Sequence, residues 1–199
     1  MIHVMCADLS GGEEDLYRKL YESASPERKL RADRYRRQED RLRCVAADVL
    51  LKKALGKTDY RMERSEFGKP YITDQPGFHF NLSHSGRYVV LAYGDREVGV
   101  DVQQHTDANL EALARRWFSP EEYAYAEGSR QRFYEIWTAK ESYGKYLGKG
   151  LCMDLRSFSV LTPMPDLCFR HIFLSDDYSL CLCSTQTEYT LTLPDLRQL

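Results

Sequence analysis

The sequence has little net charge, no long apolar run and no paired cysteine motif. Its formal net charge is −2 over 199 residues, which gives no electrostatic reason to expect nucleic acid or a membrane as a partner. No apolar run approaches the roughly 20 residues that span a bilayer, and residues 1–9 carry no basic leader. We therefore expect a cytoplasmic protein, and we expect it to act as a monomer.

The cysteines also exclude two classes of small protein. None of the six forms a Cys-x-x-Cys pair, and their spacing suits neither a zinc site nor a small disulfide scaffold. Most lie among apolar residues, as Cys181 and Cys183 do beside Leu180 and Leu182. We predict that they are reduced core residues.

The first part of the chain alternates between strand and helix patterns. Residues 2–8 read as a strand, and Leu16 and Leu20 lie four apart in an expected helix. A longer helical segment is predicted to begin at Ser25-Pro26, an N-cap followed by proline, and to end at Gly56. Strands are expected at residues 78–83, 88–93 and 98–102, with Gly94-Asp95 as a hairpin turn between the last two.

Helices return at residues 108–147, and strands are predicted again at 158–161, 168–174, 178–184 and 189–193. The order of strand, helices and strands occurs twice, and no low-complexity linker separates the two occurrences. We predict an α+β fold of two α+β halves packed together, residues 1–103 and 104–199.

Asp101 and Gln103 lie at the end of an apolar strand. A period of two places both side chains on one face, and two oxygen-bearing side chains there suit a hard cation such as Mg²⁺. Taken alone, the pattern more often marks a solvated strand end.

The segment Trp137–Lys145 places Trp137, Glu141 and Lys145 at four-residue steps on one helix face. Glu141 offers a second metal oxygen, and Lys145 offers a point charge for a phosphate. A surface Glu–Lys pair beside a core tryptophan is the alternative reading.

Two further segments carry groups that bind phosphate. Residues 28–43 are rich in arginine, with acidic residues interleaved, so a solvated helix face explains most of them. The others are Lys69, in the run Phe67–Tyr71, and Ser83 and His84, in the run Asn81–Gly86.

Taken in order, these blocks resemble the Sfp-type 4′-phosphopantetheinyl transferases over nearly the whole chain. The matching blocks are residues 25–50, 67–71, 78–86, 98–102, the run Phe118-Ser119-Pro120-Glu121-Glu122, and residues 137–151. Several spaced blocks in the right order are more specific than any single motif.

The resemblance implies a fold of two pseudo-symmetric α+β halves with the active site between them. It also implies the activity and the role of each residue. The enzyme is expected to transfer the 4′-phosphopantetheine group of coenzyme A to a serine of an apo acyl or peptidyl carrier protein, with release of 3′,5′-ADP. Asp101 and Glu141 are expected to bind Mg²⁺, with Gln103, where many relatives carry an acid, as a weak or water-mediated ligand. The residues expected to contact coenzyme A are Arg28, Arg31, Arg43, Lys69, Ser83, His84, Lys140 and Lys145.

Catalysis requires a base for the carrier serine. Glu141 is the first choice and Glu122 the second. Because a metal-bound carboxylate is a poorer base than a free one, a water relay is the third possibility.

Two alternatives belong to other classes. A nucleic-acid-binding module would use the arginine-rich segment, but such domains are usually basic overall. A carrier-binding protein that has lost catalysis would be expected to lack Asp101, Glu141 or Lys145, and all three are present.

Overall fold

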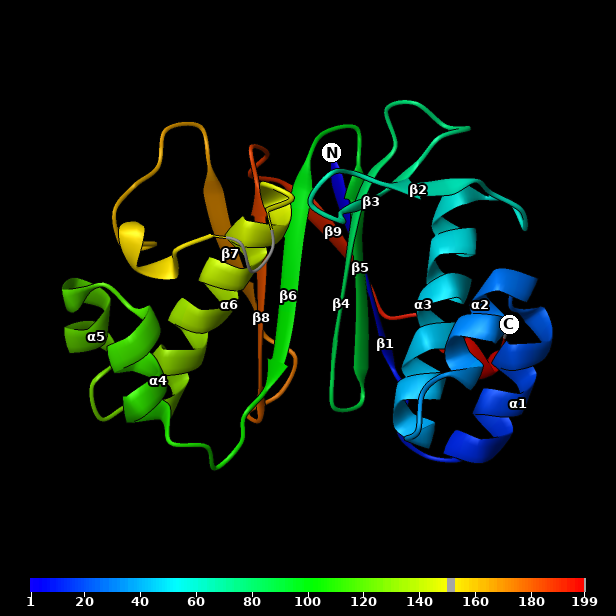
Figure 1. Cartoon of the computed structure of the whole chain (residues 1–199), viewed down its shortest axis with the longest axis horizontal. Helices are drawn as coiled ribbons and strands as arrows, with labels where there is room; N and C mark the ends of the chain where they lie inside the picture. Colours follow the sequence, from blue (N-terminus) through cyan, green and yellow to red (C-terminus); the bar gives the residue numbers. More distant parts are fainter. Residues whose placement is uncertain (150–152, 199) are drawn as a thin grey trace.

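The computed structural model describes residues 1–149 and 153–198, and it contains two sheets with helices on their outer sides (Figure 1). The first sheet has the strand order β4-β5-β1-β9 and the second has the order β6-β8-β7. A short ribbon, β2-β3, stands apart from both. The mixed α+β architecture with two halves, predicted from the sequence, is confirmed.

The first half packs three helices on its sheet. Helix α3 supplies more of the buried apolar residues between helices and sheet than any other element, and Gly56 ends it in the left-handed conformation. Ser25 caps α2, because its side chain accepts a hydrogen bond from the backbone N–H of Arg28. The elements are β1 (Ile2–Asp8), α1 (Glu13–Ser23), α2 (Pro26–Asp33), α3 (Gln38–Leu55), β2 (Met62–Arg64), β3 (Pro70–Ile72), β4 (His79–Ser85) and β5 (Tyr88–Gly94).

The second half places α6 on the second sheet, with α4 and α5 beyond it. Phe118, Phe133 and Ile136 form part of the apolar core between these helices. The elements are β6 (Val98–Gln104), α4 (Leu110–Trp117), α5 (Pro120–Ala126), α6 (Arg130–Tyr146), the 3₁₀ helix η2 (Leu155–Ser157), β7 (Cys168–Ile172), β8 (Tyr178–Ser184), β9 (Tyr189–Thr192) and the 3₁₀ helix η3 (Leu196–Gln198).

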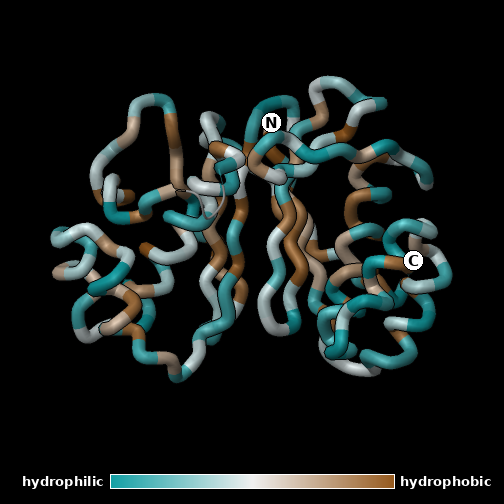
Figure 2. Tube along the Cα trace, viewed as in Figure 1, coloured by the Kyte–Doolittle hydropathy of each residue, from teal (hydrophilic) through white to brown (hydrophobic). Residues whose placement is uncertain are grey.

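The two halves share a core between their sheets. Val4 and Val90 of the first sheet pack in one cluster with Val100, Leu180 and others of the second. Figure 2 shows apolar residues concentrated along these central strands and polar residues along the outer loops. Burial of apolar surface on both sheets therefore joins the halves.

Strands β4 and β6 lie side by side at the centre of the molecule (Figure 1), but side chains rather than a backbone ladder connect them. The backbone N–H groups of Val100, Val102 and Gln104 donate to the side-chain oxygens of Asn81, Ser83 and Ser85, respectively, at 2.8, 3.2 and 2.9 Å. This polar seam between β4 and β6 leads to the candidate site.

Several local predictions are wrong. Gly94-Asp95 does not close a hairpin, because β5 pairs with β1 and β4 whereas β6 pairs with β8. The long helical segment is two helices, since the chain leaves helical geometry between Asp33 and Gln38. Residues 158–161 form no strand.

The end of the chain returns to the first half. Strand β9 pairs in parallel with β1, and Arg197 of η3 donates hydrogen bonds to the carbonyls of Ser10 and Gly11. The second half predicted from the sequence, residues 104–199, thus contributes one strand to the first sheet.

The described residues bear on two further features, the state of the cysteines and the presence of membrane-spanning helices. Cys6, Cys44, Cys168, Cys181 and Cys183 are free thiols, and Cys152 lies outside the residues described. In the described part of the chain, no helix is long and apolar enough to cross a bilayer.

Candidate active site

Asp101 and Lys145 meet where β6 faces α6. The Lys145 ammonium lies 2.6 Å from Oδ1 of Asp101 and also donates to the hydroxyl of Ser83 and the carbonyl of Val100, at 2.9 and 3.1 Å. These three bonds use all the donors of a lysine. Lys145 therefore holds Asp101 in a fixed position, and it must release one partner to bind a phosphate.

The second oxygen of Asp101 is left without a partner. Oδ2 is buried and makes no hydrogen bond, although the side chain is 8 % exposed. An unpaired buried carboxylate oxygen is costly, so this atom marks a place for a cation or a donor from outside the chain.

Glu141 lies one helical turn before Lys145 and close enough to Asp101 for their charges to interact. Partial burial raises the pKa of Glu141, the negative charge of Asp101 raises it further, and Lys145 lowers it. Two carboxylates on facing elements favour a shared cation. The structure thus brings Asp101, Glu141, Lys145 and Ser83 together.

Ser83 links this cluster to the polar seam. Its hydroxyl donates to Oδ1 of Asp101 at 2.9 Å and accepts the N–H of Val102. Because Ser83 is buried and already bonded on both sides, its role in this structure is to orient Asp101.

His84 and Arg43 extend the cluster toward α3. The pKa of His84 is lowered, first by partial desolvation and then by the charges of Arg43 and Lys145. Arg43 donates to the carbonyl of Gly86 at 2.6 Å and to Asp40 at 2.7 Å, while its Nε is buried without a partner. Both residues add donors or positive charge beside Asp101.

Lys69 lies at the other end of β6. Its ammonium contacts Glu97 at 2.6 Å, the carbonyl of Val98 at 3.2 Å and the carbonyl of Tyr146 at 3.1 Å. Its three donors are therefore used within the protein, so a phosphate would have to replace one of these partners.

Arg28 and Arg31 line a separate pocket of about 350 Å³ between α2 and residues 58–62. Arg28 is buried and pairs with the fully buried Asp48 at 3.5 Å. Asp48 also accepts hydrogen bonds from the backbone of Ser25 and from Tyr60. Asp48 thus ties both walls of this pocket together.

Glu122 and Lys140 are not brought to Asp101. They form an ion pair of 2.7 Å in which neither side chain is exposed. Glu122 also closes the capping box of α5 with Ser119 and accepts the N–H of Val160. The base role predicted for Glu122 and the coenzyme A contact predicted for Lys140 would therefore require this enclosed pair to open.

Gln103 follows Asp101 by two residues and is half-buried, with a period of two placing it on the same strand face. Within residues 1–149 and 153–198, no group of three or more His, Cys, Asp or Glu side chains could hold a metal. A cation at this site would therefore depend on two carboxylates, the amide and the substrate.

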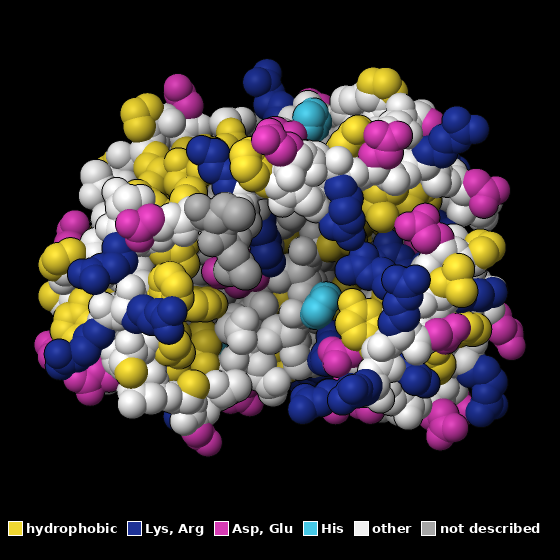
Figure 3. All heavy atoms as spheres, viewed as in Figure 1, with side chains coloured by type: hydrophobic (Ala, Val, Ile, Leu, Met, Phe, Trp, Pro, Cys, Tyr) yellow, Lys and Arg dark blue, Asp and Glu magenta, His cyan; other side chains and the backbone are white. Residues whose placement is uncertain are grey.

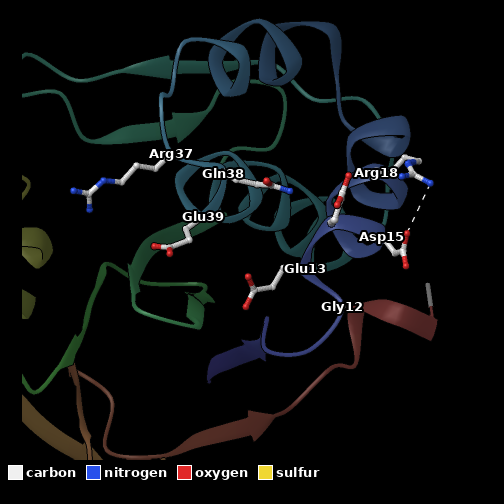
Figure 4. A pocket seen from close by; sticks show the side chains of 8 residues that line it. Gly12, Glu13, Asp15, Arg18, Arg37, Gln38 and Glu39 are labelled. Atoms are coloured by element: carbon white, nitrogen blue, oxygen red, sulfur yellow. Dashed lines mark ion pairs between the residues drawn. The ribbon is translucent and has the colours of Figure 1, made fainter.

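The surface beside the cluster differs from that of a pocket at the first turn of α1. Figure 3 shows lysine and arginine side chains gathered over the half that carries α2 and α3, beside the line where the halves meet. Figure 4 shows a pocket at the first turn of α1, lined by acidic residues such as Glu13, Asp15 and Glu39. Arg18 and Arg37 also line that pocket, and Arg18 pairs with Asp15 at 3.8 Å. We place the candidate site at Asp101, whose carboxylate has an unpaired oxygen and a lysine beside it.

Paired carboxylates and a lysine, set between two α+β halves, are suited to an enzyme that transfers a phosphate-linked group. Comparison with known proteins agrees. Residues 97–194 match the family model of the 4′-phosphopantetheinyl transferase superfamily, and residues 13–95 match that of the 4′-phosphopantetheinyl transferase N-terminal region.

Three relatives carry the same name. A 4′-phosphopantetheinyl transferase of Bacillus subtilis is 33 % identical over 91 % of this chain and 89 % of its own length. The transferase Sfp of Bacillus subtilis strain 168 is 40 % identical over 68 % of this chain and 65 % of its own. The transferase HetI of Nostoc sp. is 31 % identical over 81 % and 75 %. The chain belongs to the 4′-phosphopantetheinyl transferase superfamily, which confirms the family and enzyme class predicted from its motifs.

The site contains residues that the motifs did not reveal. Asn81 and Asp48 lie within matching blocks that assign them no role, because their importance depends on partners 19 and 12–23 residues away. The block predicted through Leu151 ends partly outside the described residues, since residues 150–152 are not described.

Proposed function

We propose that this enzyme moves the 4′-phosphopantetheine group of coenzyme A onto the hydroxyl of a serine in an apo acyl or peptidyl carrier protein. The observation that carries the proposal is the cluster of Asp101, Glu141 and Lys145 at the junction of the halves, with Oδ2 of Asp101 unpaired. The relatives bear the name of this activity.

The reaction is a substitution at phosphorus. The serine oxygen bonds to the β-phosphorus of coenzyme A, and the bond from that phosphorus to the bridging oxygen breaks. The products are the phosphopantetheinyl serine and 3′,5′-ADP, and the serine proton passes to a base. Negative charge grows on the leaving oxygens, so nearby positive charge accelerates the step.

Lys145 is the cation of this chain best placed to supply that charge. Its ammonium is 25 % exposed and bonded to Asp101, Ser83 and Val100. We infer that it exchanges one of these partners for a phosphate oxygen when coenzyme A binds. Asp101 then loses part of its neutralising charge, which favours a second cation.

The residues fit Mg²⁺. Oδ2 of Asp101 is a buried oxygen without a partner, and Glu141 lies near enough to feel its charge. Hard oxygen ligands of this kind, completed by substrate phosphates and water, are those that Mg²⁺ prefers. We propose that Asp101 and Glu141 hold the ion, with Gln103 as a weak or water-mediated ligand. When bound, Mg²⁺ neutralises charge on the pyrophosphate.

Glu141 is our choice for the base. Its raised pKa makes it a stronger proton acceptor than an ordinary glutamate. A water held by Glu141 would serve the same purpose if the carboxylate binds metal. Glu122 is too enclosed for the role.

The basic residues around the cluster suit the other end of coenzyme A. Arg43 and His84 lie on the α3 side of Asp101, and Arg28 and Arg31 line the pocket at α2. We propose that they bind the adenosine end with its 3′-phosphate, as the resemblance implies. Arg43→Ala should weaken the binding of coenzyme A more than the binding of 3′-dephospho-coenzyme A. Equal losses of affinity for both ligands would show that Arg43 serves the fold and does not bind the 3′-phosphate.

Mass spectrometry of apo carrier proteins incubated with the enzyme, coenzyme A and Mg²⁺ tests the activity. A carrier serine should gain the phosphopantetheine mass, and 3′,5′-ADP should appear in equal amount. Asp101→Asn serves as the inactive control. Absence of both products with acyl and peptidyl carriers alike would refute the proposal.

We also propose that the protein is a monomer and is located in the cytoplasm. Gel filtration tests the first of these proposals, and cell fractionation tests the second.

A further inference from the structure

Helix α6 approaches strand β6 unusually closely at one residue, Gly99. A Cβ built on Gly99 would lie well inside contact distance of the Ser142 carbonyl oxygen and 2.5 Å from the Tyr146 nitrogen, both on the helix backbone. Non-bonded heavy atoms essentially never come within 3.0 Å of a Cβ. The absence of a side chain at Gly99 therefore permits the observed spacing of helix and strand.

Two lysines hydrogen-bond to backbone carbonyls on either side of Gly99, where α6 meets β6. Lys69 bridges the carbonyl of Val98, on β6, to the carbonyl of Tyr146, at the end of α6. Lys145 extends from α6 to the carbonyl of Val100. The carbonyls before and after Gly99 are thus each bound by an ammonium group.

The Lys69 contact is built into the fold. Its side chain is 14 % exposed, and Glu97, held in turn by His79, fills its third donor. Its stem packs against Gly148, where an added Cβ would lie 3.2 Å from Cδ of Lys69. The ammonium faces the junction between helix and strand, so its position follows from the fold and not from a ligand.

We propose that Gly99 and Lys69 are positioning residues that set the distance between α6 and β6, and with it the distance of Glu141 and Lys145 from Asp101. The inference rests on the proposed transferase function for its catalytic consequence. Asp101 follows Gly99 by two residues on β6, while Glu141 and Lys145 flank the point where the helix touches it. Any outward shift of α6 separates the groups that must act together.

The required precision is high. A misplacement of about 1 Å in a catalytic group costs on the order of 100-fold in rate. A methyl group at Gly99 would meet backbone atoms on both sides of one helical turn, and backbone cannot rotate away as a side chain does. The helix must therefore move, or the strand must bend.

The experiment compares Gly99→Ala and Lys69→Met with a matched control, Gly94→Ala. A Cβ at Gly94 also meets close neighbours, Ile2 and the Met1 carbonyl at 2.8 Å, but at the end of β5, where this strand pairs with β1 in the first sheet. Crystal structures, kcat and KM for coenzyme A, and calorimetric Mg²⁺ titration in the presence of coenzyme A are measured for each.

For Gly99→Ala we expect a longer Lys145–Asp101 distance, kcat lower by roughly 100-fold, a smaller change in KM, and weaker Mg²⁺ binding. For Lys69→Met we expect a loss of kcat of roughly tenfold. Gly94→Ala should lower the melting temperature and leave kcat unchanged.

Three outcomes would overturn the inference. Gly99→Ala could keep the 2.6 Å ion pair and the wild-type kcat. Lys69→Met could raise KM for coenzyme A at constant kcat, which would make Lys69 a ligand contact. Gly94→Ala could lower kcat as much as Gly99→Ala. If the wild type itself transfers nothing, the proposed function fails, and the crystal structures still decide whether Gly99 sets the spacing.

Discussion

The carboxylate of Glu122 and the ammonium of Lys140 form an ion pair of 2.7 Å in which both side chains are fully buried. Lys140 also donates to the carbonyls of Leu155 and Phe158 at 2.6 and 2.7 Å. The pair therefore fastens residues 155–160 to α5 and α6. Its position explains why two charged residues inside family motifs do not face the substrate.

The first prediction concerns the stability of this pair. Lys140→Met should destabilise the fold by about 3–5 kcal/mol, because it leaves the buried Glu122 carboxylate without its counter-charge and removes the ammonium donor from two carbonyls. Arg115→Met is the matched control, since the Arg115–Glu111 pair is about two-thirds exposed on both sides and such pairs contribute less than about 1 kcal/mol. Urea unfolding measures both. A stable Lys140→Met protein with a raised KM for coenzyme A would restore the ligand role.

The second prediction concerns Asp101 and Glu141 as one unit. Asp101→Asn and Glu141→Gln should each nearly abolish turnover while the protein stays folded. If both carboxylates hold one cation, as proposed, the double variant should be little worse than either single one. Single-turnover rates and melting curves decide this. Losses that multiply would show that the two residues act independently.

A third prediction addresses Gln103. With a neutral amide there, we expect Mg²⁺ to bind poorly alone and coenzyme A to complete its shell, so that the two bind with positive and reciprocal coupling. Gln103→Glu should tighten Mg²⁺ binding without coenzyme A and reduce the coupling. Gln103→Ala should keep substantial activity, since water replaces the amide oxygen. A folded but inactive Gln103→Ala protein would contradict this view, as would an unchanged Mg²⁺ affinity in Gln103→Glu.

The fourth prediction concerns the pH dependence of coenzyme A binding. The pKa of His84 is lowered in the free enzyme by partial desolvation and by Arg43 and Lys145, so the ring is neutral at pH 7. A bound phosphate would stabilise the charged ring and raise that pKa. Binding should therefore take up a proton, and affinity should rise as pH falls between the free and bound pKa values.

Calorimetry in buffers of different ionisation enthalpy measures this proton uptake. The 3′-phosphate titrates in its own right near pH 6, so His84→Gln provides the baseline. Equal proton uptake by wild type and His84→Gln would show that His84 does not contact a phosphate.

Local patterns predicted much of the fold because they depend on neighbours in sequence. Strand β1 and the caps at Ser25 and Gly56 are confirmed at the residues expected. The hairpin predicted at Gly94-Asp95 is wrong because the pairing of these strands depends on residues that are distant in sequence. A turn pattern predicts a change of chain direction, but tertiary packing decided that β6 joins β8.

In the candidate site, too, local patterns could be predicted and long-range packing could not. The cluster of Asp101, Glu141 and Lys145 follows from two motifs whose residues lie at fixed offsets on one strand and one helix. Sequence could not separate Lys145 from Lys140, which lies five residues earlier in the same motif. Lys140 is buried because α5 and residues 155–160 cover its side of α6, and that packing leaves no periodic signal.

The seam between β4 and β6 joins the halves through three hydrogen bonds, one at every second residue along each strand. Asn81, Ser83 and Ser85 each receive the amide of the residue 19 positions later in the chain. Sliding one half past the other by a single residue would point the amides of β6 away from these oxygens, and sliding by two would leave an amide and an oxygen unmatched. The halves therefore cannot drift gradually along this line. They stay in one register or separate, and Ser83 and His84 on β4 therefore keep their place opposite Asp101 on β6.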